Sequence, residues 1–145
     1  MNVIHVTHGE GALFRLLGCQ VDPKLTMSAQ IDHILSKVRP RITAILRTRG
    51  KYDTEQLVLQ YKTHILGFME YSCGCISHAS KTQLDRLDAA QRRFLHGLQI
   101  DERIALRVYN LAPPSLRRGI AIQGLIHKRV LGVAYSAFNS LLPFC

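Results

Sequence analysis

Two pairs of acidic residues have the types and spacing that could hold a divalent metal ion. Asp85 and Asp88 are three positions apart, and Asp101 directly precedes Glu102. Paired carboxylates bind Mg²⁺ and support phosphoryl-transfer chemistry. The chain contains no Asp-Asp sequence, however, and acidic residues at the start of a helix stabilise its dipole, which explains Asp101 and Glu102 without a metal. We therefore predict no catalytic residue among them.

The segment Cys73-Gly-Cys75-Ile-Ser-His78 is a second candidate, either for a metal or for thiol chemistry. Zinc sites space two cysteines by two to four residues and need four ligands, whereas one residue separates these cysteines and no fourth ligand is evident. A nucleophilic thiol needs a positioned base, and only closeness in sequence connects His64 or His78 to the cysteines. We predict that the cysteines are packing residues and that the chain binds no metal.

A block of basic residues between positions 37 and 51 is the strongest functional signal. The chain of 145 residues has 19 Lys and Arg against 10 Asp and Glu, and this block contains no acidic residue. Solvated helix faces usually mix both signs of charge, so a block of one sign indicates an anionic partner such as nucleic acid. The candidate phosphate-binding residues of the block are Lys37, Arg39, Arg41, Arg47, Arg49 and Lys51.

Two smaller groups of arginines extend this prediction. Arg86, Arg92 and Arg93 lie in one helical segment that also contains acidic residues. Arg117 and Arg118 follow a Pro-Pro pair, in the predicted first turn of a helix, where cations oppose the helix dipole. That unfavourable position indicates a role other than helix stability, so both are nucleic-acid-binding candidates.

Helices must position most of these residues. Between Met27 and Arg49 the apolar residues form one stripe about 120° wide on a helix. Pro40 lies opposite the stripe, and we expect it to kink the helix or to split it after Val38. A second helix over 54–71 is apolar almost all round, which predicts a central position.

The remaining elements are shorter or have weaker patterns. Asp53 and Ser80 begin sequences typical of capping boxes, and the second of these opens a helix that reaches about residue 98. A short helix follows near 101–109, and we expect Ser115 to cap a last helix that ends near Leu131. Residues 12–21 are short and apolar and end at Asp22-Pro23, a turn signal that favours a strand or hairpin.

The predicted fold is therefore mostly α: a short N-terminal strand or hairpin followed by a bundle of about four to five helices. We expect residues 1–11 to be loose, 12–132 to form one helical domain, and 133–145 to be an apolar tail.

Several motifs, in this order and spacing, resemble the region that follows the catalytic core in non-LTR retrotransposon reverse transcriptases. The resemblance spans about residues 12–132. The motifs are Phe14-Arg-Leu-Leu-Gly18 with Asp22-Pro-Lys-Leu25, Leu46-Arg-Thr-Arg49, Leu57-Val-Leu-Gln-Tyr-Lys62 with Met69-Glu-Tyr71, Leu84-Asp-Arg-Leu-Asp-Ala-Ala-Gln-Arg-Arg-Phe94, and Leu111-Ala-Pro-Pro-Ser-Leu-Arg-Arg118 with Leu125-Ile-His-Lys128.

The resemblance implies a thumb-like fragment of an RNA-directed DNA polymerase, inactive without its catalytic palm. It implies a primer-grip-like role for Phe14, Leu17 and Gly18 at the end of the palm. The basic helices would contact the phosphate backbone of a template–primer duplex, RNA or DNA, and the missing palm domain would be a protein partner. Magnesium would belong to that palm, so no cofactor is expected in this chain.

Two other functions stay open on the sequence: a free-standing basic helical module that binds nucleic acid, and a helical protein-interaction domain. A thumb without its palm should expose apolar patches near residues 12–25 and 133–145. The first eleven residues do not have the pattern of a signal peptide, and no run of 18 apolar residues occurs. We therefore expect an intracellular protein, nuclear or cytoplasmic, with no membrane partner.

Overall fold

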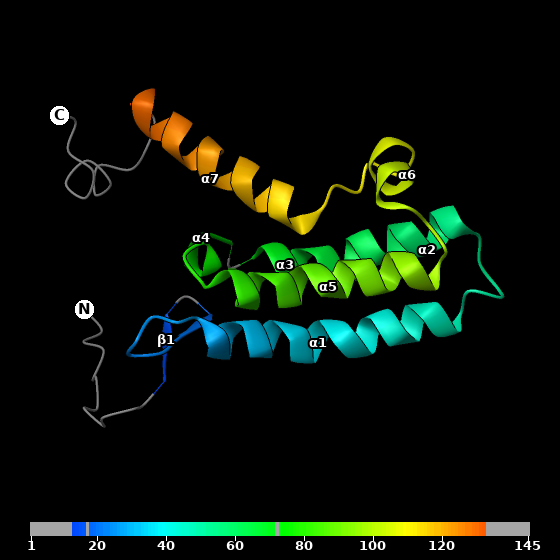
Figure 1. Ribbon diagram of the computed structural model, residues 1–145, viewed down its shortest axis with the longest axis horizontal. Coiled ribbons are helices and arrows are strands. Elements are labelled where there is room, and N and C mark those ends of the chain that lie inside the picture. Colours follow the sequence, from blue (N-terminus) through cyan, green and yellow to red (C-terminus); the bar gives the residue numbers. More distant parts are fainter. Residues whose placement is uncertain (1–12, 17, 72, 133–145) are drawn as a thin grey trace, which may run out of the picture.

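The computed structural model describes residues 13–16, 18–71 and 73–132, and this part of the chain begins with a small antiparallel hairpin (Figure 1). Strand β1 (Phe14–Leu16) pairs with β2 (Cys19–Val21), with Phe14 opposite Val21. Gly18 in the turn has φ +85, a left-handed conformation that glycine adopts without steric cost. The predicted tail, 133–145, and most of the predicted loose segment, 1–11 with residue 12, lie outside the described residues.

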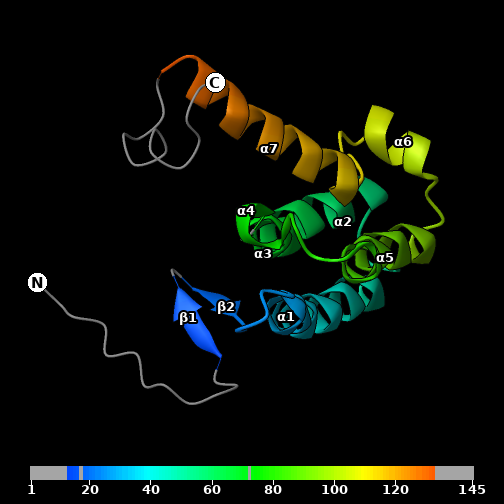
Figure 2. The ribbon, with the colours of Figure 1, turned by 60° about the vertical axis from the view of Figure 1, so that its left-hand side comes forward.

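Three long helical segments form the bundle (Figures 1 and 2). Helix α1 (Ser28–Arg47) and helix α5 (Lys81–Gly97) run side by side in the same direction. The segment between them in sequence runs the opposite way and consists of α2 (Thr54–Tyr61), the π-helical η1 (Lys62–Leu66) and α3 (Gly67–Glu70).

Three further helices complete the described chain. The short α4 (Cys73–Ile76) precedes α5, and the short α6 (Glu102–Arg107) follows it. Helix α7 (Pro114–Val130) crosses the bundle and packs against α4 and α5 (Figure 2). The prediction of a mostly α fold with an N-terminal hairpin and a helical bundle is confirmed.

The apolar stripe of α1 forms one wall of the core, as its periodicity predicts. The buried positions of this helix include Ile31, Ile34, Leu35, Val38, Ile42 and Ile45. Opposite them, the ring of Tyr61 stacks on that of Phe94, with the ring centroids 4.3 Å apart. The Tyr61 hydroxyl is satisfied within the core, because it donates to the Met69 Sδ at 3.3 Å or to the Gln91 Oε1 at 3.4 Å. Burial raises the pKa of Tyr61 far above its ordinary value.

Pro40 does not split α1, so that part of the prediction is wrong. The helix continues through Pro40 from Ser28 to Arg47. Proline removes one backbone N–H, which leaves the carbonyl of Ser36 without its helical donor. Both residues are exposed, so water can satisfy that carbonyl and the helix can continue.

The π-helical segment changes which face of the second helical segment is buried. Phe68 follows the fully buried Tyr61 by seven positions, which on a regular α-helix differ by only about 20° in direction. Phe68 is nevertheless 43% exposed, while Met69 is buried. The wider turn of η1 accounts for this shift, because it places an extra residue between the two buried faces. The segment has a buried face, as expected of a central helix, but the apolar Leu59 and Phe68 on its other side are exposed.

Helix starts follow the predicted caps except at the last helix. Asp53 and Gln56 form a capping box, and the Ser80 hydroxyl accepts from the Gln83 N–H at 3.4 Å. Helix α7 starts two residues earlier than expected: Pro113 is the N-cap and Pro114 the first helical residue, so Ser115 does not cap it. Proline suits this position because the first N–H of a helix has no helical partner.

Candidate nucleic-acid interface

Helices α1 and α5 are joined by one contact near their N-terminal ends and another near their C-terminal ends. The line along which the outer surfaces of these two parallel helices meet is called the seam below. Near the start of the helices, Arg86 bonds Asp32 at 2.6 Å. Near the end, the Arg49 Nη1 donates to the carbonyl of Gly97 at 3.3 Å. The helices approach closely there, since a Cβ on Gly97 would lie 2.7 Å from the methyl groups of Leu46.

Two exposed arginines lie on the faces of α1 and α5 that border this seam. Arg39 is seven residues after Asp32, and Arg93 is seven residues after Arg86, so each lies on the same helix face as its predecessor and about 10 Å further along. Because Asp32 and Arg86 are in contact and the helices are parallel, Arg39 and Arg93 are at one level. Neither side chain makes a hydrogen bond or ion pair within the described part of the chain.

Further basic residues lie toward the end of α1 and directly after it. Arg47 in the last turn of α1, Arg49 and Lys51 are all exposed. Arg39 and Arg47 are separated by about 12 Å of helix rise. We call Arg39, Arg47, Arg49, Lys51 and Arg93 the basic seam.

Other candidates of the same block lie on the opposite flank of α1. Lys37 is exposed and lies beside a groove next to the hairpin. The Arg41 guanidinium lies 3.9 Å from the ring centroid of Phe68. Arg92 is exposed but lies on the far flank of α5, beside Glu102 and Pro113. The structure therefore does not bring Lys37, Arg41 and Arg92 onto the basic seam.

Three candidate arginines form ion pairs with acidic residues of the chain. Arg86 is paired with Asp32, and Arg117 with Glu70. Arg118 donates to both carboxylate oxygens of Asp88, at 2.7 and 3.1 Å, and both side chains are only 11% exposed. These pairs give Arg117 and Arg118 a role in attaching α7 to α3 and α5, which explains their place in the first turn of a helix.

No local sequence pattern indicates these acidic partners. Asp32, Glu70 and Asp88 are separated from their arginines by 54, 47 and 30 residues respectively. The only available signal was the unfavourable position of Arg117 and Arg118 against the helix dipole.

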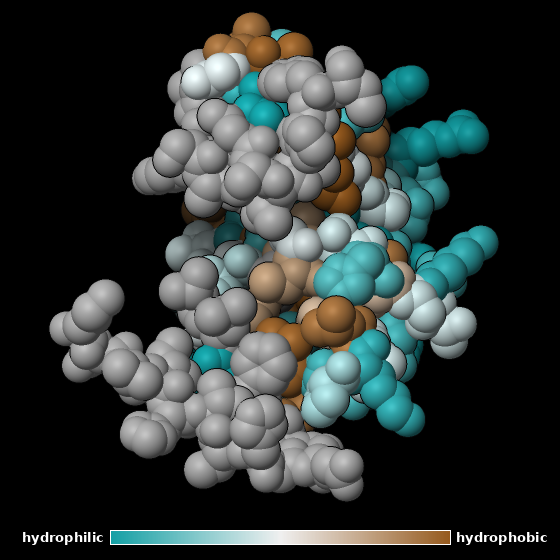
Figure 3. Space-filling view, turned by 90° about the vertical axis from the view of Figure 1, so that its left-hand side faces the viewer, coloured by the Kyte–Doolittle hydropathy of each residue, from teal (hydrophilic) through white to brown (hydrophobic). Residues whose placement is uncertain are grey.

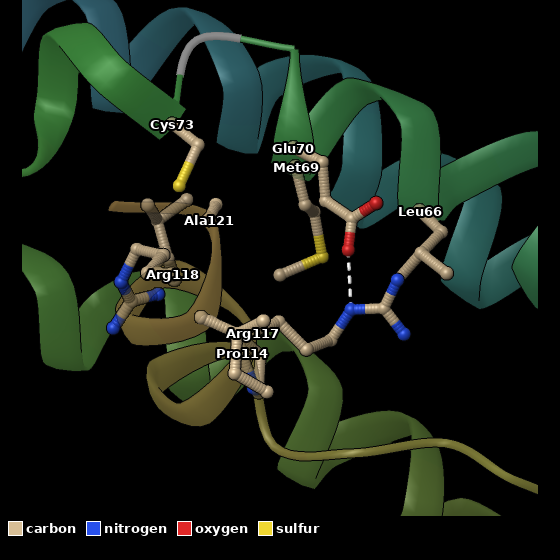
Figure 4. Close-up of a pocket in the computed structure, with 10 residues that line it drawn as sticks. Leu66, Met69, Glu70, Cys73, Pro114, Arg117, Arg118 and Ala121 are labelled. Carbon is tan, nitrogen blue, oxygen red and sulfur yellow. Dashed lines mark hydrogen bonds and ion pairs between the residues drawn. The ribbon is translucent and has the colours of Figure 1, made fainter. Parts of the chain in front are cut away.

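A cavity of about 390 Å³ lies where α7 crosses α3 (Figure 4). Cys73 and Met69 contribute to its walls, and the Glu70–Arg117 pair lies at its side. Burial raises the pKa of the Cys73 thiol, the nearby Arg118 lowers it and Glu70 raises it, and burial is the largest of these effects. A raised pKa keeps this thiol protonated near neutral pH and makes it a poor nucleophile. Among the described residues, no group of three His, Cys, Asp or Glu side chains could hold a metal ion.

The primer-grip-like residues lie in or next to the hairpin. Phe14 is in β1, Gly18 forms the turn, and Leu17 lies outside the described residues. A Cβ on Gly18 would lie 3.3 Å from the Tyr71 ring, so the turn packs closely on the end of the second helical segment.

Apolar residues are exposed along α7 and directly after its end. Ile120, Ile126, Val130 and Leu131 are each more than half exposed. Figure 3 shows hydrophobic residues gathered at the upper edge of the molecule, where α7 ends. The expected patch near residues 12–25 is smaller: Leu13 and Leu25 are 54% exposed. In the described ranges, no helix combines the length and apolar character needed to cross a bilayer.

No family model, curated protein or solved structure matches this chain.

Proposed function

We propose that the chain is a thumb-like region of a non-LTR reverse transcriptase and binds the phosphate backbone of a template–primer duplex, RNA or DNA, through the basic seam. The observation that carries this proposal is the position of Arg39 and Arg93, both exposed, at one level on two parallel helices. Neither side chain has an acidic partner in the described part of the chain, so both are available to phosphate groups.

Charge distribution supports the same proposal. The chain has a formal net charge of +9, and the basic seam is rich in arginine, which binds phosphate in a two-pronged geometry. Lys37, Arg41 and Arg92 lie on other flanks, and Arg86, Arg117 and Arg118 are paired with acids. We therefore restrict the proposed duplex-binding set to Arg39, Arg47, Arg49, Lys51 and Arg93.

The test is the salt dependence of binding to a fluorescently labelled 20-base-pair RNA–DNA hybrid, followed by anisotropy. Each phosphate contact contributes about 0.9 to the slope of log affinity against log salt. The Arg39→Ala/Arg93→Ala variant should bind at least tenfold more weakly and lose nearly two units of slope. The matched control is Arg103→Ala/Arg107→Ala, which removes the same charge from exposed positions of α6. Equal losses in the two variants would show that net charge, not the seam, governs binding.

The exposed apolar side of α7 favours a second candidate, contact with another protein. In a reverse transcriptase that protein would be the palm; in a helical interaction domain it would be a separate partner. Apolar patches of this kind mark protein interaction sites. A chain that binds no hybrid but associates with a palm domain or with itself through α7 would favour this candidate.

A further inference from the structure

A groove of about 430 Å³ lies between the hairpin, α1 and α3, away from the basic seam. Its walls carry three basic side chains, Arg15 from β1 and His33 and Lys37 from α1. No acidic side chain lines it among the described residues. The side chains of Arg15 and Lys37 are exposed and make no hydrogen bond or ion pair with that part of the chain. The groove therefore presents positive charge that the described chain does not neutralise.

The same groove has aromatic walls. Tyr71 is 71% exposed and Phe68 is 43% exposed, and both line the groove. The guanidinium of Arg41 lies 3.9 Å from the Phe68 ring centroid, which places a further cation next to this wall. Exposed rings beside cations are the combination that binds unpaired nucleotides: a base stacks on a ring while its phosphate meets a basic side chain.

Two contacts hold the groove in shape. The Gln20 N–H of β2 donates to the Gln30 Oε1 of α1 at 2.7 Å and ties the hairpin to the helix. The turn at Gly18 lies close to the Tyr71 ring, where a Cβ would be only 3.3 Å from its Cε1 and Oη atoms. The hairpin wall with Arg15 and the helical wall with Tyr71 are thus fixed relative to each other.

We propose that this groove binds an unpaired nucleotide of a nucleic-acid strand, with its base against Tyr71 and Phe68 and its phosphate at Arg15 and Lys37. The inference deepens the proposed function, because a strand that leaves the duplex would enter the groove. The volume of the groove falls within the range of sites for small ligands of nucleotide size.

The experiment compares a blunt labelled duplex with the same duplex bearing four unpaired thymidines at one 3′ or one 5′ end. The full chain should bind one overhang more tightly than the blunt duplex, by about tenfold, the typical value of one stacked base and its phosphate contact. Tyr71→Leu and Arg15→Ala should each abolish most of that preference and leave blunt-duplex binding unchanged. Tyr52→Leu and Arg103→Ala are matched controls at exposed positions, and neither should alter the preference. Thermal unfolding of each variant checks that its fold is intact.

The outcomes separate this proposal from the proposed function. No preference for either overhang in the full chain, or a preference that survives Tyr71→Leu in a folded variant, overturns the groove proposal. Equal loss of blunt and overhang binding in Tyr71→Leu also overturns it, since the groove would then be part of the duplex surface. A third outcome is that the overhang preference is lost in Tyr71→Leu while Arg39→Ala/Arg93→Ala binds the blunt duplex as tightly as the natural chain. That outcome supports nucleotide binding in the groove and refutes duplex binding at the basic seam. Failure to bind either nucleic acid refutes both.

Discussion

Arg118 and Asp88 join α7 to α5 through two hydrogen bonds, at 2.7 and 3.1 Å, in a site where both side chains are 11% exposed. Breaking an ion pair with so little access to water leaves one charge without a partner. We predict that Arg118→Leu lowers the free energy of unfolding by about 2–3 kcal/mol. Urea unfolding followed by circular dichroism measures this, and a change below about 0.5 kcal/mol would contradict the structural role of the pair.

The Arg86–Asp32 pair should behave differently, although its distance is similar. Its side chains are 37% and 58% exposed, so water already screens the two charges. We predict that Arg86→Leu changes the free energy of unfolding by less than about 1 kcal/mol. The same urea titration makes the comparison with Arg118→Leu direct. A loss as large as that of Arg118→Leu would show that exposure does not govern these pairs.

Asp22 should make the stability of the N-terminal turn depend on pH. Its carboxylate accepts from the Thr26 N–H at 3.0 Å, the Thr26 hydroxyl at 2.9 Å and the Met27 N–H at 2.9 Å. The Thr26 N–H is the largest cause of the lowered pKa of Asp22. A carboxylate whose folded pKa is lowered stabilises the fold above its unfolded pKa of about 4, and this contribution is lost as pH falls through the folded pKa.

We therefore predict that Asp22→Asn is less stable than the natural chain at pH 7 and that the difference shrinks below about pH 4. Thermal unfolding of both proteins between pH 3 and 7 measures the difference. A difference that is constant over this range would show that the charge of Asp22 has no part in the turn.

Gly18 should resist substitution, because its φ of +85 is unfavourable for other residues and a Cβ would meet Tyr71 at 3.3 Å. We predict that Gly18→Ala destabilises the fold by about 1–2 kcal/mol. Gly119→Ala in α7 is the matched control, since a Cβ there meets nothing within 4 Å. It should stabilise its helix by about 0.5–1 kcal/mol. Thermal unfolding tests both, and an equal effect of the two substitutions would be inconsistent with the strained turn.

The outer side of α7 should bind a hydrophobic dye. Ile126 and Val130 are 53% and 61% exposed, so replacing them with lysine removes apolar surface and few packing contacts. We predict that Ile126→Lys/Val130→Lys reduces the fluorescence of bound dye and changes stability by less than about 1 kcal/mol. Unchanged dye fluorescence would place the dye-binding surface elsewhere on the molecule.

Local sequence patterns correctly predicted those features of the fold that are set by residues close together in the sequence. The stripe from Met27 to Leu46 identified the buried face of α1, and the residue types at Asp53 and Ser80 located two helix starts, because these features depend on residues three or four positions apart. Pro40 was misjudged because the effect of a proline depends on whether water can reach the carbonyl that it leaves unpaired. The basic block between positions 37 and 51 predicted a positively charged surface but not which side of α1 each side chain occupies. In the fold, some of these residues border the seam and others lie beside the groove.

Contacts across long stretches of sequence could not be predicted. The pairs of Arg118 with Asp88 and of Arg117 with Glu70 exist because α7 crosses the bundle, and nothing near these residues specifies that crossing. The groove could not be predicted from the sequence for the same reason, because Arg15, Lys37 and Tyr71 come from three separate parts of the fold. Tyr71 occurs in a motif of the resemblance, but its exposure depends on the packing of the hairpin.

The π-helical segment Lys62–Leu66 makes the aromatic wall of the groove insensitive to the loss of one residue of the chain. This segment holds one residue more than an α-helix needs between its two buried faces. Removing one residue between 62 and 66 would restore ordinary helical spacing, and Met69 would then follow Tyr61 by seven positions, on the same buried face. Phe68 would stay on the outer side. A natural variant with such a deletion would therefore keep the surface on which a base could stack.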